Sequence, residues 1–194
     1  MYRPITYRRT YMKFAPKSFK DKNGEEFVLR NAEADDAADL LKYLRETASQ
    51  TPYLVSEPEE ITLTEEQEKE YIQKLNDSER DLMLVAYAGG RHIGNCSLRG
   101  SERLRYRHRG RVGIALYEEF CGRGIGKIML EAVLGVAAQT GYEQAELEVV
   151  AGNERAIALY EKLGFKIYGT LPDNMKYKDG TYADSHWMMK KLNR

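Results

Sequence analysis

The chain has 194 residues, of which 42% are hydrophobic and 31% are charged, as is typical of a globular rather than a disordered or fibrous protein. Lys and Arg together number 30, as do Asp and Glu, and this balance argues against a general nucleic-acid-binding protein. Cys96 and Cys121 are far apart, which predicts neither a disulfide scaffold nor a metal site and fits a reducing compartment. No apolar run approaches the roughly 20 residues that span a bilayer, so we expect a cytoplasmic protein with no membrane contact.

The length suits one domain, and we place it at residues 26–194, after a basic N-terminal extension at residues 1–25. The extension is irregular in pattern, and the single acid of residues 1–22 is Asp21. It is interpreted either as a solvated arm or added edge strand, or as a contact for an anionic partner. Its basic residues are Arg3, Arg8, Arg9, Lys13, Lys17, Lys20 and Lys22.

The first half of the domain is expected to begin with a strand at residues 26–30. Apolar residues at helical spacing then predict a helix over residues 35–49, and two prolines predict a loop over residues 51–61. Thr64 and Gln67 match a capping box, which predicts a second helix from there to about residue 76.

Three strands follow, and they are expected at residues 82–88, 93–98 and 111–117, with the first two joined by a glycine hairpin turn. A glycine-rich turn leads into a long helix that ends near Gln139. The remaining elements are a strand at residues 145–150, a helix at 154–163, and strands at 165–169 and 182–191. This order predicts a mixed α/β (α+β) sheet with helices on both faces.

The glycine-rich turn, Cys121-Gly122-Arg123-Gly124-Ile125-Gly126-Lys127, lies between a predicted strand and a predicted helix. Glycines let the backbone turn tightly, and the unpaired N–H groups at the positive end of the helix dipole favour a diphosphate. Arg123 and Lys127 could add positive charge. The alternative is a plain strand-to-helix turn that uses glycine for packing.

Two other phosphate-binding loops are excluded by the residues present. A P-loop needs a glycine where Cys121 stands and a hydroxyl where Ile128 stands. A dinucleotide fingerprint needs G-x-G-x-x-G, whereas the spacing here is G-x-G-x-G.

A second motif reads NERAIALYEKLGF at residues 153–165. Asn153 is a good N-cap, Ala156, Leu159 and Leu163 are expected to form the buried stripe of the helix, and Gly164 is suited to end it. With GRGIGK at residues 122–127 and the order of the elements, the chain resembles the GNAT superfamily of N-acetyltransferases over roughly residues 26–192. Cys121 departs from the family pattern, which has Gln or Arg there.

The resemblance implies a mostly antiparallel sheet with a splay between two parallel strands, and acetyl-CoA as co-substrate without a metal. It places the pantetheine arm in the splay, along the backbone from Ile114 through Leu116 to Tyr117. It places the diphosphate on Gly122, Arg123, Gly124, Ile125, Gly126 and Lys127. The Asn153 position commonly contacts the pantetheine arm, and the Tyr160 position lies near the thioester sulfur.

Two catalytic roles follow from this resemblance. Tyr160 is the candidate proton donor to the departing thiolate. Glu148 is the candidate base, because ribosomal-protein N-terminal acetyltransferases carry a catalytic Glu five residues before the matching Asn. On a strand Glu148 points away from its two neighbours, so it can face the cleft while they face the core. Alternatively it is a solvated glutamate, and His108 or water is the base.

The surrounding loops give weaker indications. The basic run at residues 103–111 could guide the adenosine 3′-phosphate or an acidic substrate, or it is a solvated loop. Residues 53–60 are expected to line one side of the acceptor site in this fold, and Glu57, Glu59 and Glu60 would suit a cationic amine such as a polyamine.

The sequence therefore predicts an enzyme that transfers an acetyl group to a primary amine by direct attack on the thioester. A small-molecule amine is favoured over a protein N-terminus. The alternative is a CoA-binding sensor without turnover. By analogy with the family, the last strands and the basic arm could build a homodimer interface.

Overall fold

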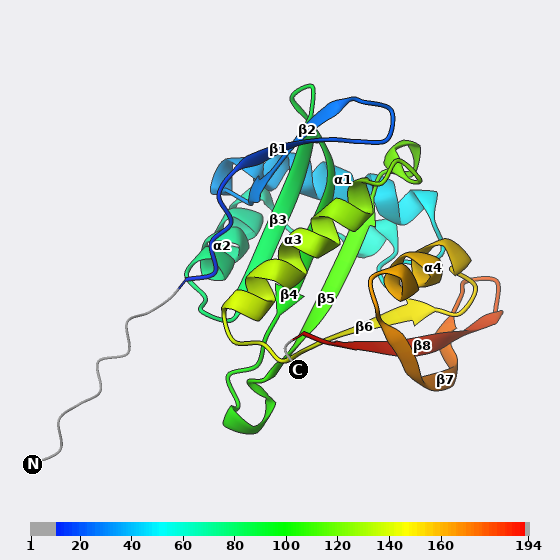
Figure 1. The fold of residues 1–194 in the computed structure, drawn as a ribbon. Coiled ribbons are helices and arrows are strands. Elements are labelled where there is room, and N and C mark those ends of the chain that lie inside the picture. The colour runs from blue at the N-terminus through cyan, green and yellow to red at the C-terminus, as the bar shows by residue number, and fades with distance from the viewer. Residues whose placement is uncertain (1–10, 193–194) are drawn as a thin grey trace, which may run out of the picture.

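The computed structural model describes residues 11–192, which form one eight-stranded sheet in the order β1-β2-β3-β4-β5-β6-β8-β7 (Figure 1). Neighbouring strands are antiparallel except β5 and β6, which are parallel. The strands are β1 (Lys17–Lys20), β2 (Glu26–Asn31), β3 (Asp81–Ala88), β4 (Arg91–Arg99), β5 (Arg109–Leu116), β6 (Gln144–Val150), β7 (Lys166–Lys176) and β8 (Tyr182–Lys191).

Helices cover both faces of the sheet, as predicted: α3 and α4 lie in front of it in Figure 1, and α1 and α2 lie behind. Their bounds are α1 (Ala37–Gln50), α2 (Glu65–Asn76), α3 (Ile125–Gln139) and α4 (Glu154–Lys162). The predicted capping box is confirmed, because the Gln67 N–H donates to Thr64 Oγ1 at 3.3 Å and the Thr64 N–H donates to Gln67 Oε1 at 2.9 Å. Gly164, with φ of 88°, follows α4 as predicted.

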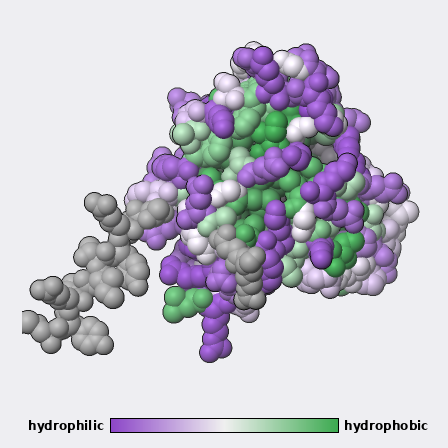
Figure 2. Space-filling model, in the orientation of Figure 1, coloured by the Kyte–Doolittle hydropathy of each residue, from purple (hydrophilic) through white to green (hydrophobic). Residues whose placement is uncertain are grey.

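Two apolar clusters hold these layers together. The larger lies between the sheet and α3 and α4, where Met129, Leu130 and Val133 are fully buried. The smaller lies between the sheet and α1 and α2, around Leu40 and Ile72. Burying one such side chain contributes about 1.5–3 kcal/mol, so these faces dominate the stability of the fold. In Figure 2 apolar atoms gather around the α3 side of the sheet, bordered by hydrophilic side chains.

The start of the described chain packs on the larger cluster. Residues 17–20 form β1 at the edge of the sheet, so this part of the basic extension is an added edge strand. Phe19 stacks on Phe27 with ring centroids 5.7 Å apart, and Met12 is buried. The expectations that concern residues 1–10 lie outside the described residues.

The strand predicted at residues 165–169 is too short, because β7 continues to Lys176. Pro172 and Asp173 predict a break, and Asp173 does have a φ of 51°. The pairing with β8 shifts register between Leu171 and Met175, so a bulge absorbs these residues and the strand resumes.

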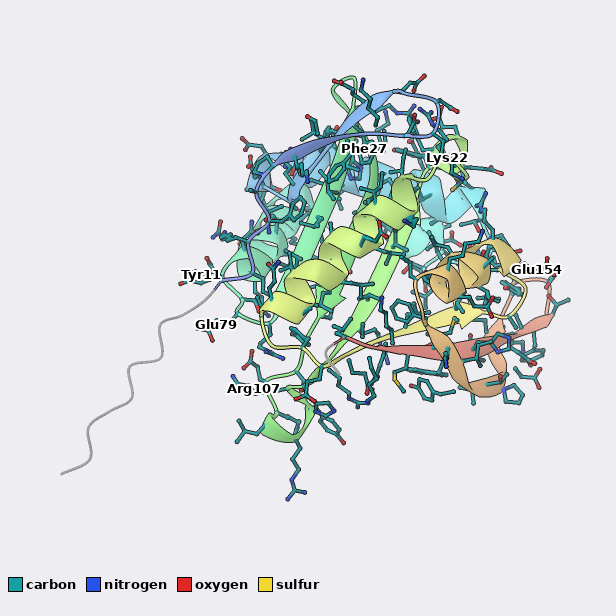
Figure 3. The ribbon with its side chains drawn as sticks, in the orientation of Figure 1. Tyr11, Lys22, Phe27, Glu79, Arg107 and Glu154 are labelled. Carbon is teal, nitrogen blue, oxygen red and sulfur yellow. The ribbon has the colours of Figure 1, made fainter. Side chains whose placement is uncertain are left out.

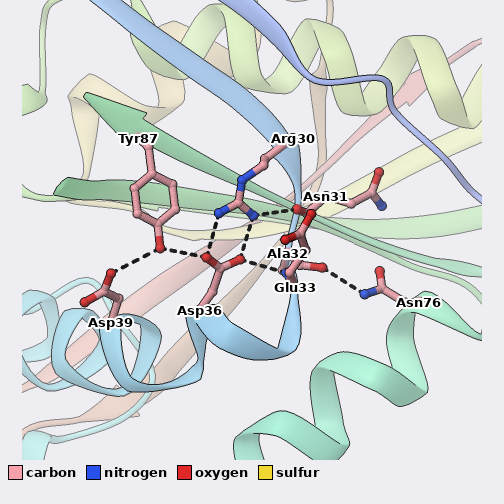
Figure 4. Close-up of polar contacts among 8 residues, drawn as sticks. All are labelled: Arg30, Asn31, Ala32, Glu33, Asp36, Asp39, Asn76 and Tyr87. Carbon is pink, nitrogen blue, oxygen red and sulfur yellow. Dashed lines mark hydrogen bonds and ion pairs between the residues drawn. The ribbon is translucent and has the colours of Figure 1, made fainter. Parts of the chain in front are cut away.

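A partly buried ion pair fixes the start of α1 to the sheet (Figure 4). Arg30 of β2 donates to both carboxylate oxygens of Asp36 at 2.7 Å. The Tyr87 hydroxyl donates to Asp36 Oδ1 at 2.8 Å, and the Glu33 N–H donates to Asp36 Oδ2 at 2.7 Å. One carboxylate therefore ties together β2, β3 and the entrance of α1.

Within residues 11–192, no helix combines the length and apolarity needed to cross a membrane.

Candidate active site

The two parallel strands separate partway along their length. β5 pairs with β6 only from Arg109 to Arg111, opposite residues 144–146. Beyond that point β5 pairs with β4 as far as Leu116, and β6 pairs with β8 as far as Val150. Each strand therefore turns one unpaired edge of backbone N–H and C=O groups toward the gap. The expected splay is present, and Ile114 and Leu116 lie on its β5 side.

The turn between β5 and α3 presents a row of free backbone donors. Gly122 and Gly124 have φ values of 77° and 85°, and α3 begins at Ile125. Within residues 11–192, the N–H groups of residues 122–127 have no hydrogen-bond acceptor. Because these donors lie at the positive end of the α3 dipole, the turn forms a cradle that suits phosphate oxygens.

Glycine is required at two positions of the cradle for different physical reasons. A Cβ on Gly122 would meet no atom within 4 Å, so its positive φ is the constraint there. A Cβ on Gly126 would lie 3.3 Å from Leu116 Cδ1 and 3.4 Å from Leu159 Cδ2. Gly126 therefore lets α3 approach β5 and α4 closely.

The two charged side chains of the cradle already have acidic partners. Arg123 Nε donates to Asp21 Oδ2 at 2.5 Å, and Arg123 also forms an ion pair with Glu25. Lys127 Nζ lies 2.9 Å from Glu131 of the same helix. These residues therefore offer their backbone N–H groups to the cradle, while their side-chain charges are compensated.

Asn153 caps the start of α4 and Tyr160 lies on α4, on the other side of the gap from the cradle turn. Asn153 is the N-cap as predicted, since its Oδ1 accepts from the Ala156 N–H at 3.2 Å. The Tyr160 side chain is buried, and its ring contacts Phe165 edge-on. Its hydroxyl has no hydrogen-bond partner among the described residues. Burial, with a smaller contribution from Cys96, raises the pKa of Tyr160, which keeps the hydroxyl protonated at neutral pH.

Glu148 lies on the opposite face of the sheet from Tyr160. Leu147 and Val149 point into the core beneath α3 and α4, so Glu148 faces the side of α1 and α2, as strand alternation predicts. Asn174 Nδ2 donates to Glu148 Oε1 at 2.5 Å and to Ser185 Oγ at 2.8 Å. The carboxylate is exposed, so one oxygen is anchored while the group remains accessible.

The basic loop lies at the wrong end of β5 for the role expected of it. Figure 3 shows Arg107 at the opposite end of the molecule from Lys22, which is next to the cradle. An eight-residue strand such as β5 spans about 26 Å. The expectation that residues 103–111 guide the adenosine 3′-phosphate therefore does not fit the structure. His108 is also on the far side of the paired segment from the gap, which argues against it as the base.

Two loops meet over the α1 and α2 side of the gap. The Tyr53 hydroxyl donates to the Gly152 carbonyl at 3.1 Å. Lys178, at the tip of the β7–β8 hairpin, lies 3.1 Å from Glu57 and forms a second ion pair with Glu59. Glu60 Oε2 accepts from the Glu57 N–H at 2.8 Å. The acids expected to receive a cationic amine are therefore already occupied.

No sequence motif indicates a functional role for Asn174, Lys178 or Lys22. Asn174 follows Pro172 and Asp173 in a stretch that resembles a loop, and no motif surrounds Lys178. Their partners are distant in the sequence, so no local pattern could have indicated them.

Comparison with known proteins agrees with this geometry. Residues 41–165 match the model of the acetyltransferase (GNAT) family. The chain is 34% identical over 168 residues to an N-alpha-acetyltransferase of Saccharolobus solfataricus, covering 85% of this chain and 90% of that protein. It is 28% identical over 119 residues to an L-amino acid N-acetyltransferase of Escherichia coli, covering 60% of this chain and 72% of that protein.

Solved structures share the fold. A GNAT-family acetyltransferase from Streptococcus pneumoniae superposes with a TM-score of 0.83 at 27% identity, covering 86% of this chain and 99% of that one. A phosphinothricin acetyltransferase from Sinorhizobium meliloti, solved with acetyl-CoA, gives 0.75 at 24% identity, covering 85% and 88%, which shows likeness of fold alone.

The cradle and the parted strands fit a co-substrate with a diphosphate and an extended amide-containing arm. The protein is an N-acetyltransferase, and the chain belongs to the acetyltransferase (GNAT) family.

Proposed function

We propose that the protein transfers an acetyl group from acetyl-CoA to the primary amine of a small molecule by direct attack on the thioester. The observation that carries this proposal is the gap between β5 and β6. It opens beside the cradle, with Tyr160 on one face of the sheet and Glu148 on the other. An acceptor can therefore approach from the side of α1 and α2.

The coenzyme-binding residues are part of the proposal. The free N–H groups of residues 122–127 would hold the diphosphate. The unpaired edge of β5 at Ile114 and Leu116 would pair with the amides of the pantetheine arm. Tyr117 does not fit the role expected of it, because it follows β5 and its N–H donates to the Ile93 carbonyl of β4 at 3.2 Å. Asn153, at the start of α4 on the far side of the gap, would contact the same arm.

Acetyl-CoA supplies an acetyl thioester, whose carbonyl carbon gains the bond to nitrogen and whose C–S bond breaks. Glu148 would accept the proton of the attacking amine, directly or through water, because an α-amine with a pKa of about 8 is mostly protonated at neutral pH. A free N–H on β5 would stabilise the oxyanion. Tyr160 would donate its proton to the departing sulfur.

The contacts of the α1–α2 loop, which lies over the acceptor side of the gap, favour a small molecule as the acceptor. The α1–α2 loop is tied to the turn between β6 and α4 through Tyr53 and Gly152, and to the β7–β8 hairpin through Lys178. These contacts restrict a long groove. They also occupy Glu57 and Glu59, so the acids of this loop give no support to a polyamine acceptor.

A protein N-terminus is the second candidate, and the relative from Saccharolobus solfataricus favours it by its name and its 34% identity. The Escherichia coli relative is named for L-amino acids. Both names refer to α-amines, so we place α-amino groups first among the acceptors to be tested.

An acetyl-transfer assay that detects the free thiol of CoA tests the proposal. The acceptors are free amino acids, short peptides with free N-termini, polyamines and aminoglycosides, with N-acetylated versions of the same compounds as controls. Turnover with small amines above that with peptides is expected. Turnover with peptides alone would favour the second candidate, and thiol release that needs no amine would contradict amine transfer.

A homodimer is a further proposal. The outer strand β7 carries exposed Ile167, Tyr168 and Leu171, and an uncovered edge strand can pair with a second copy. Analytical ultracentrifugation of the protein and of Tyr168→Lys would test it. A wild-type monomer at all concentrations would contradict it.

A further inference from the structure

The N-terminal segment closes one side of the cradle. The Lys22 N–H donates to the Arg123 carbonyl at 2.9 Å, so the turn between β1 and β2 lies directly against the turn before α3. Arg123 reaches back to Asp21 and Glu25 in the same turn. Asp21 and Arg123 are 102 positions apart in the sequence, so only the folded chain brings the two turns together.

The turn that carries Lys22 is well fixed. Asp21 Oδ1 accepts from the N–H groups of Asn23 at 2.8 Å and Glu25 at 3.0 Å. The carboxylate of Asp21 is 1% exposed, and its contacts with Arg123 and these N–H groups outweigh burial and lower its pKa. β1 and β2 hold the turn from both sides.

Lys22 brings a positive charge to the cradle. A Cβ placed on Gly124 would lie 3.2 Å from Lys22 Cγ and 3.4 Å from Lys22 Cε, so the aliphatic stem runs along the turn. Arg123 and Lys127 are compensated by acids. Lys22 is exposed and, within residues 11–192, forms no ion pair.

We propose that Lys22 binds a phosphate group of the coenzyme, and that the turn at residues 21–25 is a second wall of the cradle. This inference rests on the proposed coenzyme site at residues 122–127. It adds a residue that lies outside the segment matched by the family model, which begins at residue 41. Arg123 then serves as a positioning residue, because it holds the turn in place with its side chain.

Calorimetry with the full chain tests the proposal through Lys22→Ala, Lys22→Arg and the control Lys20→Ala. Lys20 lies two positions away and pairs at the surface with Glu26 at 3.8 Å. We expect Lys22→Ala to weaken CoA binding about 5- to 30-fold, the effect of losing one partly exposed charge-assisted hydrogen bond. Lys22→Arg should retain most of the affinity, and Lys20→Ala should match the wild type.

Three ligands distinguish the phosphate groups. An equal loss with CoA and 3′-dephospho-CoA assigns Lys22 to the diphosphate, and a loss confined to CoA assigns it to the 3′-phosphate. Both results support the proposal. An unchanged affinity for CoA, or an equal loss with pantetheine, which has no diphosphate, overturns it. If wild-type protein binds pantetheine but gains nothing from the phosphates of CoA, the coenzyme site at residues 122–127 fails as well, which separates the two failures.

Discussion

Asn174 of β7 donates a hydrogen bond to Glu148 of β6 at 2.5 Å, although β8 lies between these strands. The bulge in β7 makes this contact possible, because the register shifts between Leu171 and Met175. The irregular part of the sheet therefore orients the candidate base, and Asn174 is a positioning residue for it.

Glu148→Gln is expected to lower kcat by about 10²-fold or more, the usual contribution of a positioned general base. Asn174→Ala should lower kcat roughly 5- to 10-fold, with an unchanged KM for acetyl-CoA, since it removes one hydrogen bond to a charged group. Steady-state kinetics with both substrates varied provides the measurement.

Asn174→Asp is the sharper variant, because it replaces the donor with a like charge beside Glu148. It should reduce kcat more than Asn174→Ala does. Equal rates for the two variants would contradict the positioning role of Asn174, and an unchanged rate in Glu148→Gln would remove Glu148 from the mechanism.

Tyr160→Phe is expected to lower kcat by about 10²-fold while the KM for acetyl-CoA stays nearly constant, because only the proton donor is lost. Burial raises the pKa of Tyr160, so its ionisation should cause no loss of wild-type activity up to about pH 10. Tyr142→Phe is the matched control: Tyr142 is also buried, and its hydroxyl donates to the Arg80 carbonyl at 2.6 Å. That variant should lose stability rather than rate. The same fall in kcat in both variants would assign Tyr160 a structural role.

The parts of the fold that depend on local patterns could be predicted from the sequence. The helix predicted from apolar spacing over residues 35–49, the capping box at Thr64 and the N-cap at Asn153 lie close to where the residues indicate, because each depends on contacts within one turn or one face. The glycine turn also belongs to this class, since its backbone conformation requires glycine at Gly122.

The polar contacts across the molecule could not be predicted in this way. Lys178 and Glu59 are 119 positions apart, and ion pairs between exposed side chains leave no periodic signal. The extension of β7 past Pro172 escapes prediction because pairing with β8 outweighs the local preference for a turn. The expected role of the basic loop fails for a different reason: its charge is visible in the sequence, but its distance from the cradle depends on the direction and length of β5.

Gly122→Ala should lower the free energy of unfolding by about 1–2 kcal/mol, because an L-residue is strained at a φ of 77°. It should also weaken CoA binding, since relief of that strain would turn the N–H groups of the cradle. Gly135→Ala is the control within α3, where a Cβ meets no atom within 4 Å. That change should raise stability by about 0.5–1 kcal/mol and leave CoA binding unchanged. Chemical denaturation and calorimetry give both quantities, and unaltered CoA affinity in Gly122→Ala would contradict the role of the cradle.

Asp36→Asn should destabilise the fold by about 2 kcal/mol. This is less than the loss expected on breaking a fully buried ion pair, because Arg30 is partly exposed and its charge is screened. Burial alone would raise the pKa of Asp36, but hydrogen bonds from Arg30, the Glu33 N–H and Tyr87, with the charge of Arg30, outweigh it and lower the pKa. A lowered folded-state pKa gives stability at neutral pH that is lost as the pH falls below the ordinary value of about 4.

The variant should therefore show a flatter dependence of stability on pH below about 4 than the wild type. Asp39→Asn provides the comparison, because among residues 11–192 Asp39 accepts one hydrogen bond, from Tyr87 at 3.2 Å, and should contribute less. The measurement is the free energy of unfolding as a function of pH for the two variants and the wild type. Identical slopes below about pH 4 would refute the assignment to Asp36.

Lys178→Ala should raise the KM for the amine acceptor several-fold and leave the KM for acetyl-CoA unchanged. Lys178 joins the β7–β8 hairpin to Glu57 and Glu59 over the acceptor side, whereas the cradle lies on the other side of the gap. Its loss should also improve turnover of bulky amines relative to small ones, because the contact between the β7–β8 hairpin and the α1–α2 loop is lost.

Lys176→Ala is the control for the removal of a charge, because Lys176 lies on the same hairpin with its ammonium over the Tyr182 ring. Exposed ion pairs are screened by salt, and at about 0.5 M salt the Debye length falls to roughly 4 Å. The acceptor KM of the wild type should therefore rise toward that of Lys178→Ala at this salt concentration. An equal change in acceptor KM for both lysine variants, or one that appears in the KM for acetyl-CoA, would show that the two loops do not form the acceptor wall.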